Sequence, residues 1–228
     1  MHIPDGFIDM PTSIAAVAVA GVGVGACLRR TRTTLSDEQI PVVGLTAAFV
    51  FAGQMVNFPV LAGTSGHLLG AVLAAALVGP WAGALAVTVV LTVQALLFAD
   101  GGVSAWGLNV VNMALVGALL GYAVLVALRR LFPRSARGVV IAAGLAAAMA
   151  PVLGALAFTL EFALGGNGAA PVRQVLVSMV GVHAAIGVGE GLITAMILSA
   201  VLATRPDLVH VAVPRTAPMG SPSTASAS

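Results

Sequence analysis

The first two residues of the chain, Met1 and His2, place three nitrogen atoms within one short stretch. These are the Met1 α-amine, the His2 backbone amide and Nδ1 of the His2 imidazole. Bound to one ion together, they close a five-membered and a six-membered chelate ring. The amide binds only after losing its proton, which Ni(II) and Cu(II) can drive, and planar nitrogen coordination is typical of these two ions. A large second residue should block removal of the initiator methionine, so we expect the mature chain to begin at Met1.

A fourth nitrogen is predicted at His67, which ends the segment Asn-Phe-Pro-Val-Leu-Ala-Gly-Thr-Ser-Gly-His over residues 57–67. The glycines at 63 and 66 permit tight turns that could lower the histidine between helices. Neutral imidazole is the commonest metal ligand in proteins. Two simpler interpretations stay open: His2 as a chance residue on a frayed terminus, and His67 as a capping or packing residue.

The composition is that of a protein built largely from membrane-spanning helices. Of 228 residues, 59% are hydrophobic and 8% are charged, and the mean hydropathy is +1.07. Soluble domains carry about 25% charged residues, and disordered chains need low hydrophobicity, so both classes are excluded. The chain has no lysine and its arginines lie at the ends of apolar runs, so we expect no nucleic-acid partner. The single Cys27 excludes a disulfide framework and a cysteine metal cluster.

Apolar runs of about 20 residues are long enough to cross a bilayer. We expect an all-α polytopic membrane protein of about seven transmembrane helices, with spans at 12–28, 40–57, 67–79, 81–98, 105–128, 138–164 and 174–204. The third run is short, which favours a re-entrant or tilted segment packed inside the protein. Residues 1–204 then form a single transmembrane domain, and 205–228, rich in Pro, Ser, Thr and Ala, are expected to form a disordered cytoplasmic tail.

The arginines predict the orientation of the chain in the membrane. With seven crossings, all of them except Arg173 fall on one side. The positive-inside rule places that side in the cytoplasm. The N-terminus and the loops near 58–66, 99–104 and 165–173 then face outward, so Met1 and His67 lie on the same side.

Three segments carry a family resemblance: the opening Met-His-Ile-Pro-Asp-Gly-Phe, the Asn-Phe-Pro and Gly-Thr-Ser-Gly-His motifs within 57–67, and His-Ala-Ala-Ile-Gly-Val-Gly-Glu-Gly over 183–191. Over roughly residues 1–204 the chain resembles the CbiM/NikM family, the substrate-specific membrane subunits of energy-coupling-factor (ECF) transporters for cobalt and nickel. The resemblance implies a metal held by four nitrogens in a plane, which map onto Met1, His2 and His67. It also implies seven helices, with the outward-facing N-terminus inserted into the bundle.

The function implied by the resemblance is that of the substrate-capturing (S) component of an ATP-driven importer in a bacterial inner membrane. Its transported ligand would be Ni²⁺ or Co²⁺, with no cofactor, and the sequence does not choose between the two metals. The implied partners are a transmembrane coupling (T) subunit, two ATP-binding subunits and, often in this family, a small auxiliary membrane subunit, all within membrane lipid. The chain has no Gly-x-x-x-x-Gly-Lys-Ser/Thr loop, so ATP hydrolysis must belong to partners, and we expect no enzymatic activity. Closure of the 58–66 loop would shield the ion.

Amide side chains in the predicted spans could orient the ligands. Gln54, Asn57 and Asn109 are candidates for this role, because a ligand histidine normally donates its other N–H to a nearby acceptor. Hydrogen bonding between helices is the alternative role for such amides.

His183 and Glu190 are seven residues apart and therefore share one helical face. Ionisable groups are costly in a membrane span, and we expect a structural pair, a contact with a partner subunit or an alternative metal site. A rival function is an intramembrane serine protease of rhomboid type, with Ser65 of the Gly-Thr-Ser-Gly stretch as nucleophile and His183 as base. Against it, the stretch lies on a predicted external loop and the opening sequence goes unexplained.

Overall fold

The computed structural model describes residues 1–60 and 64–212 and is mainly helical. Its elements in chain order are α1 (Met10–Thr34), η1 (Asp37–Gln39), α2 (Ile40–Gln54), β1 (Phe58–Pro59), β2 (Ser65–Gly66), α3 (Ala71–Val78), α4 (Pro80–Leu97), α5 (Trp106–Asn109), η2 (Val110–Leu120), α6 (Gly121–Leu128), α7 (Ala136–Gly165), α8 (Val172–Thr204) and η3 (Pro206–Leu208). α5, η2 and α6 follow one another without a break over residues 106–128, and η2 has π-helical hydrogen bonding.

The predicted spans correspond to seven helical segments within the described residues. Five of them, α1, α4, the 106–128 segment, α7 and α8, are long and apolar enough to cross a membrane. The other two are shorter, with 15 residues in α2 and 8 in α3. The all-α, multi-pass character is therefore confirmed, whereas seven crossings and an outward N-terminus stay predictions.

Capping side chains and prolines set where these helices begin. The Asp9 carboxylate accepts the backbone N–H of Thr12 at 2.9 Å and so satisfies one of the free N–H groups at the start of α1. Pro41 and Pro80 lie in the first turns of α2 and α4, where the missing N–H of proline is not needed. These local signals place the helix starts within a few residues of the predicted ones.

The short helix α3 lies inside the bundle, as the short third run predicts. Every residue of α3 except Leu77 is buried. The flanking residues Gly70 and Gly79 have φ angles of +69° and +87°, a backbone conformation that glycine adopts readily and other residues rarely do. These two glycines let the chain turn sharply at both ends, so α3 stays short.

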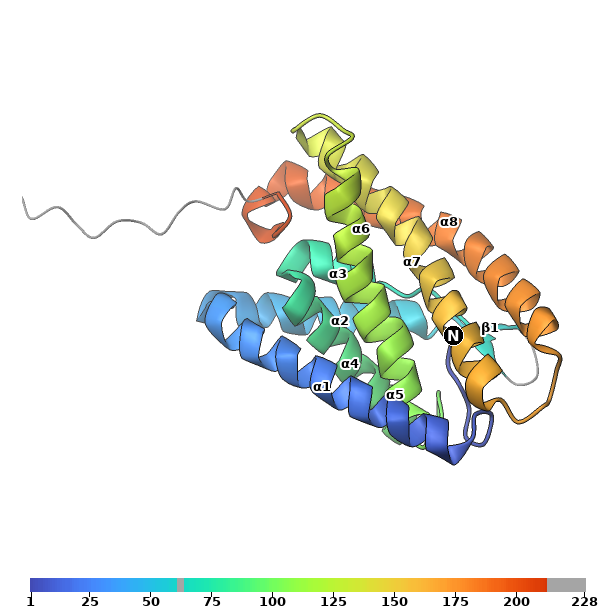
Figure 1. Ribbon diagram of the computed structural model, residues 1–228. Helices are drawn as coiled ribbons and strands as arrows, with labels where there is room; N and C mark the ends of the chain where they lie inside the picture. The colour runs from blue at the N-terminus through green and yellow to red at the C-terminus, as the bar shows by residue number, and fades with distance from the viewer. Residues whose placement is uncertain (61–63, 213–228) are drawn as a thin grey trace, which may run out of the picture.

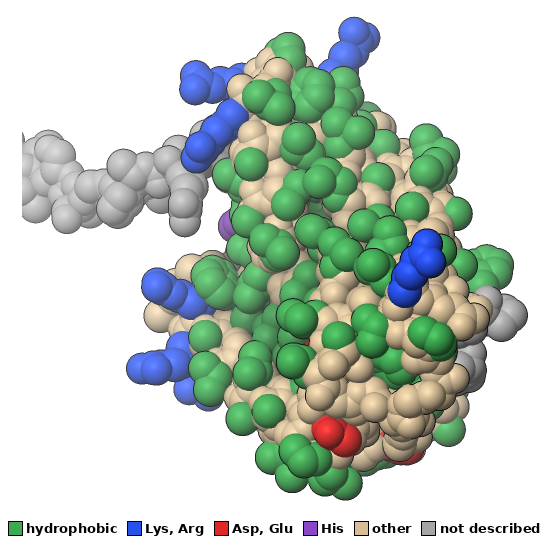
Figure 2. Space-filling model, turned by 45° about the vertical axis from the view of Figure 1, so that its right-hand side comes forward, with side chains coloured by type: hydrophobic (Ala, Val, Ile, Leu, Met, Phe, Trp, Pro, Cys, Tyr) green, Lys and Arg blue, Asp and Glu red, His purple; other side chains and the backbone are tan. Residues whose placement is uncertain are grey.

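The helices are arranged so that the N-terminus and the arginine-rich helix ends lie far apart (Figure 1). α7 and α8 run side by side along one edge of the bundle, and the N-terminus lies beside α7 and β1. The C-terminal ends of α1, α6 and α8, at or next to which arginines occur in the sequence, point to the left or the top of the same view. Figure 2 shows hydrophobic side chains over most of the visible face, with arginines mainly at its upper and left edges. This surface suits a lipid environment.

Residues 205–212, which the sequence assigned to a disordered tail, are folded. The N–H groups of His210 and Val211 donate to the carbonyls of Leu77 and Ala76 at 3.1 and 3.2 Å. The last carbonyls of a helix have no hydrogen-bond partner within the helix. For α3, the N–H groups of this segment are those partners. Arg129 also donates to the carbonyl of Val211. The rest of the predicted tail, 213–228, lies outside the described residues.

Candidate metal centre

The N-terminal segment enters the helix bundle. Met1, His2 and Ile3 are 1%, 3% and 0% exposed. Asn109, at the end of α5, clamps the backbone of Ile3: its Oδ1 accepts the Ile3 N–H at 2.8 Å and its Nδ2 donates to the Ile3 carbonyl at 3.2 Å. The same carbonyl accepts the N–H of Gly102 at 2.8 Å. Because both backbone groups of Ile3 are bonded inside the bundle, the two residues before it are fixed in position.

Further contacts hold residues 5–7 against two helix ends. Asp5 Oδ1 accepts hydrogen bonds from the backbone N–H and the hydroxyl of Ser104 at 2.7 and 2.6 Å. These bonds hold the pKa of Asp5 below its usual value. The Phe7 ring packs on Phe162 of α7 with centroids 5.1 Å apart, and its carbonyl accepts the N–H of Asn167 at 3.1 Å. The whole segment is thus attached to the structure before α5 and after α7.

The amine of Met1 is buried against β2 and α7. It donates a hydrogen bond to the backbone carbonyl of Ser65. Burial, opposed in part by the Asp100 charge, lowers the pKa of this amine from 8.0 to about 4. The Met1 side chain lies against Gly154, where an added Cβ would come within 2.7 Å of Met1 Sδ. The amine is therefore neutral near pH 7 and retains a lone pair that can bind a cation.

His67 presents its second ring nitrogen without a partner. Its Nδ1 lies 2.7 Å from the carbonyl of Leu68, which can only accept, so Nδ1 carries the proton and Nε2 the lone pair. Nε2 is buried and has no hydrogen-bond partner in the described part of the chain. Burial, followed by the nearby terminal amine, holds the pKa of His67 well below its usual value. The imidazole is therefore neutral and available as a metal ligand.

The imidazole of His2 lies next to that of His67, with ring centroids 4.6 Å apart. His2 Nε2 is 3.2 Å from Gln94 Oε1, and Nδ1 is 3.1 Å from Asp100 Oδ1. A carboxylate can only accept a hydrogen bond, so it favours a positive partner, a proton or a metal ion, at Nδ1. Burial lowers the pKa of His2, while the contact with Asp100 opposes this. The His2 ring is thus held between α4 and the loop that follows it.

The three amides predicted to orient the histidines bond groups near the histidines instead of their rings. Asn109 binds the backbone of Ile3, as described above. Asn57 Nδ2 donates to Asp100 Oδ2 at 3.0 Å, and so reaches His2 through that carboxylate. Gln54 Nε2 donates to the carbonyl of Leu69 at 2.8 Å, two residues beyond His67. None of these hydrogen bonds reaches an imidazole, so a direct role of the three amides in orienting a histidine stays a prediction.

Gln94 and Asp100 bond the two ring nitrogens of His2, and neither is among the predicted site residues. Burial raises the pKa of Asp100, but the hydrogen bonds from His2 and Asn57 outweigh it and leave the pKa below its usual value. A signal was present in the sequence: Asp100 directly follows an apolar run, at the end assigned to the same side as Met1. An acidic residue there can face a cation site.

His183 and Glu190 do not pair with each other, as predicted for a structural pair, but bond different backbone groups. His183 Nδ1 bonds the carbonyl of Met179 at 2.7 Å. Glu190 accepts the backbone N–H groups of Leu69 and Gly70, at 2.7 and 2.8 Å. Seven residues of helix separate two groups by about 10 Å along the axis, too far for a direct ion pair.

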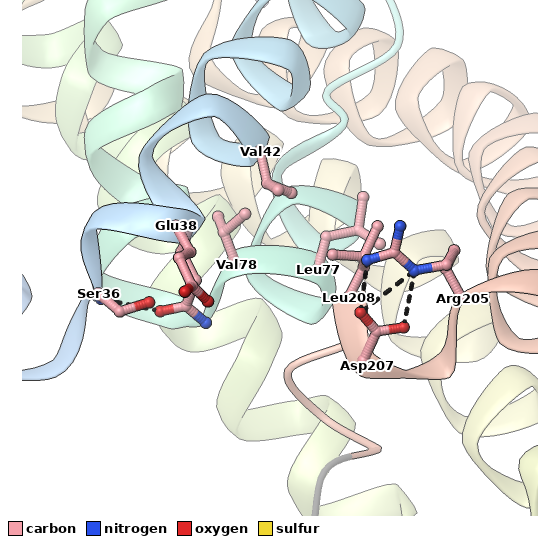
Figure 3. A pocket seen from close by; sticks show the side chains of 9 residues that line it. Ser36, Glu38, Val42, Leu77, Val78, Arg205, Asp207 and Leu208 are labelled. Atoms are coloured by element: carbon pink, nitrogen blue, oxygen red, sulfur yellow. Dashed lines mark hydrogen bonds and ion pairs between the residues drawn. The ribbon is translucent and has the colours of Figure 1, made fainter.

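A cavity of about 340 Å³ lies beside His2 and is lined also by Asp5, Ser65 and Asp100. It places two carboxylates close to the buried nitrogens. A second cavity, of about 300 Å³, lies at the other end of α3, where Arg205 and Asp207 form an ion pair at 2.7 Å (Figure 3). Within the described residues no group of three or more His, Cys, Asp or Glu side chains could hold a metal.

The loop predicted to close over the ion is described only at its ends. β1 and β2 pair antiparallel, with Phe58 opposite Gly66 and Pro59 opposite Ser65. Residues 61–63, between the two strands, lie outside the described residues. The pairing keeps Ser65, which accepts the Met1 amine, next to the end of α2.

Comparisons with known proteins agree on one kind of protein. The family model described as the cobalt uptake substrate-specific transmembrane region matches residues 2–208. A cobalt transport protein of Sorangium cellulosum is 34% identical, over 97% of this chain and 100% of its own length. A fused nickel transport protein of Rhodobacter capsulatus is also 34% identical, over 96% of this chain and 65% of its own. A crystal structure of a truncated transition metal transporter superposes with a TM-score of 0.81 at 27% identity, covering 89% of this chain and 99% of that one.

These comparisons give no support to the serine protease alternative. The matched proteins are described as metal transport proteins. In the structure, the carbonyl of Ser65 accepts the Met1 amine, and His183 bonds a carbonyl on its own helix. Ser65 of the Gly-Thr-Ser-Gly stretch therefore lies beside the N-terminus.

Proposed function

Because this chain belongs to the family of cobalt-uptake substrate-specific transmembrane regions, we propose that it captures divalent nickel or cobalt through Met1, His2 and His67. It is a membrane component of a cobalt or nickel transporter and has no enzymatic role of its own. One observation carries the proposal: the terminal amine, the His2 imidazole and the unpartnered Nε2 of His67 lie together inside the bundle.

The donor atoms suit a planar nitrogen complex. The Met1 amine, the His2 amide and His2 Nδ1 close a five- and a six-membered ring around one ion, and His67 Nε2 adds the fourth nitrogen. Planar nitrogen coordination is typical of Ni(II) and Cu(II), so of the two metals named for the relatives, nickel and cobalt, this set leans to nickel. The His2 amide must release its proton on binding, which leaves a net charge of +1 on the complex. The carboxylate of Asp100 is placed to offset that charge.

The cavity beside His2 supplies a route for the incoming ion. Asp5 and Asp100 on its wall attract a hydrated cation, and the nitrogens then replace its water molecules. This route requires the cavity to face outward, which is the orientation that the arginine distribution predicts.

The remaining parts of the proposal concern assembly. We assign the chain the role of the S component of an ECF-type importer in a bacterial inner membrane. A T subunit, two ATP-binding subunits and a small auxiliary membrane subunit would complete the importer, because a chain without a phosphate-binding loop must take its energy from partners. We assign residues 1–204 and the folded segment 205–212 to one binding domain.

The proposal is tested by extending the chain at its N-terminus, so that Met1 no longer carries the terminal amine. Adding Met-Gln before Met1 converts its amine into an amide, and the large glutamine prevents trimming. We expect nickel binding, measured by calorimetry on the purified protein, to be lost while circular dichroism shows that the helices remain folded. The matched control inserts Ala before His2; removal of the initiator then leaves alanine in the place of Met1, and binding should persist. Unchanged affinity in the extended chain would refute the terminal-amine site.

A further inference from the structure

The turn that carries His67 into α3 is held by two buried polar side chains from other helices. Glu190 of α8 accepts the N–H groups of Leu69 and Gly70 with its two carboxylate oxygens, at 2.7 and 2.8 Å. Gln54 of α2 donates to the carbonyl of Leu69 at 2.8 Å. Glu190 and Gln54 are 2% and 1% exposed. The backbone of this turn is therefore bonded from both sides.

A carboxylate inside a membrane span is costly unless its oxygens are hydrogen-bonded. Glu190 meets this condition through the two backbone N–H groups of the His67 turn. Gly70 has a φ of +69°, and the turn can take this shape because glycine tolerates it. The carboxylate and the glycine together fix where α3 begins and where the chain before it points.

α8 is itself held close to α7, which also contacts Met1. A Cβ added at Gly191 would lie 2.7 Å from the carbonyl oxygen of Gly144, so the two helix backbones touch at the residue next to Glu190. On the same helix α7, Gly154 lies against Met1 Sδ. α7 therefore contacts both the segment that carries Met1 and the helix α8 that holds the His67 turn.

We propose that Glu190 and Gln54 are positioning residues for His67: by clamping the turn 68–70 they aim Nε2 of His67 at the metal. This inference rests on the proposed function, because it assigns the two residues a role through the metal ligand. Neither side chain is one of the proposed ligands, since both bond the backbone of Leu69 and Glu190 also bonds that of Gly70. Their contribution is to hold the imidazole in the place where it completes the set of four nitrogens.

Two substitutions break the clamp in different ways. Glu190→Gln keeps the shape and one accepting oxygen, but it turns an NH₂ group toward a backbone N–H, so one bond is lost and the turn must shift. It also removes a charge. Gln54→Leu removes the bond to the Leu69 carbonyl and leaves the charge unchanged, so it separates geometry from electrostatics.

The experiment uses the full chain in detergent, with nickel alone as the probe. Nickel affinity and the d–d absorption band of the bound nickel are measured for both variants, for His67→Ala and for Glu161→Gln. Glu161 is the matched control, because it is a partly buried carboxylate on α7 that accepts a hydrogen bond from Asn112 Nδ2, at 2.6 Å, instead of from the His67 turn. Both clamp variants should bind nickel about 10- to 100-fold more weakly, the range found when a group that orients a ligand is removed.

The absorption band distinguishes positioning from a loss of stability. If the clamp aims His67, the band of both clamp variants moves toward that of His67→Ala, and Glu161→Gln keeps the wild-type band. If Glu190 only stabilises the fold, less protein binds but the band of the bound nickel is unchanged, and the inference is overturned. If wild-type protein shows no nickel band, or His67→Ala keeps the wild-type band, the proposed metal site fails before the clamp is tested.

Discussion

The carboxylate of Asp100 offers a quantitative test of how the site tolerates a divalent ion. Asp100 Oδ1 lies 3.1 Å from His2 Nδ1. A metal–nitrogen bond is about 2 Å long, so an ion on Nδ1 is within about 5 Å of this oxygen. The bound ion with one deprotonated amide carries a net charge of +1, and Asp100 is the carboxylate in contact with the ligand set. Asp100→Asn keeps the shape and removes the charge.

The size of the effect follows from Coulomb's law. Two unit charges 5 Å apart interact by about 3 kcal/mol at an effective dielectric constant of 20. The Asp100 side chain is 17% exposed, and water screens part of this. We therefore expect a loss of about 1.5–2 kcal/mol, which corresponds to about 10- to 30-fold weaker nickel binding.

The assay is a competitive titration of nickel against a chelator at fixed pH. Asp5→Asn is the matched control, since Asp5 lies on the same cavity and contributes the same charge, but its carboxylate bonds Ser104 instead of a ligand. This control should lose less than about threefold, and its loss should vanish at high salt, which screens exposed charges most. Equal losses in both variants, or wild-type affinity in Asp100→Asn, would show that the charge balance is not made at Asp100.

Two further predictions concern the N-terminus. Because burial lowers the pKa of the Met1 amine to about 4, the amine is neutral between pH 8 and 6, and the His2 amide is the group that must lose a proton on binding. Nickel affinity should therefore fall by about 100-fold over this range, one proton per ion, instead of the ~5,000-fold expected if the amine kept its usual pKa. Release of nearly two protons per ion near pH 6, measured by calorimetry, would contradict a buried neutral amine. Gly154→Leu should push the Met1 side chain away from α7 and weaken nickel binding by at least about tenfold, since a Cβ there already comes within 2.7 Å of Met1 Sδ. Gly181→Leu, at an open position on α8, is its control, and equal affinity in the two variants would contradict the packing of Met1 on α7.

The helices could be predicted from the sequence because the signal is local. Long apolar runs, several of them ending in arginines, mark the spans, and prolines and capping residues mark helix starts. The extent of α3 could not be predicted in this way. Its apolar run continues from His67, but the left-handed backbone at Gly70 delays the helix start, and the segment after residue 208 caps its end.

The ligands of the candidate site came from a different kind of signal, the residue types at the start of the chain and their family resemblance. The groups that surround these ligands could not be predicted from such signals, because their contacts join distant parts of the chain. Glu190 and Leu69 are 121 positions apart, and a helical period of seven suggested His183 as the partner of Glu190 instead. Asp100 reaches His2 because the chain turns back at Ala99, which has a φ of +52°. Such a turn cannot be inferred from helical periodicity.

The buried N-terminus bears on why an unusual ligand set can bind tightly. Ordering the backbone of a flexible terminus costs about 1–2 kcal/mol per residue. Here the Ile3 backbone is already bonded to Asn109, and Met1 and Ile3 are already buried. The ordering cost is therefore met when the protein folds, and the metal meets donors that are in place. A short peptide with the same first residues has the same nitrogens but must order them on binding, so the helix bundle's contribution to affinity is the fixed position of Met1 and His2.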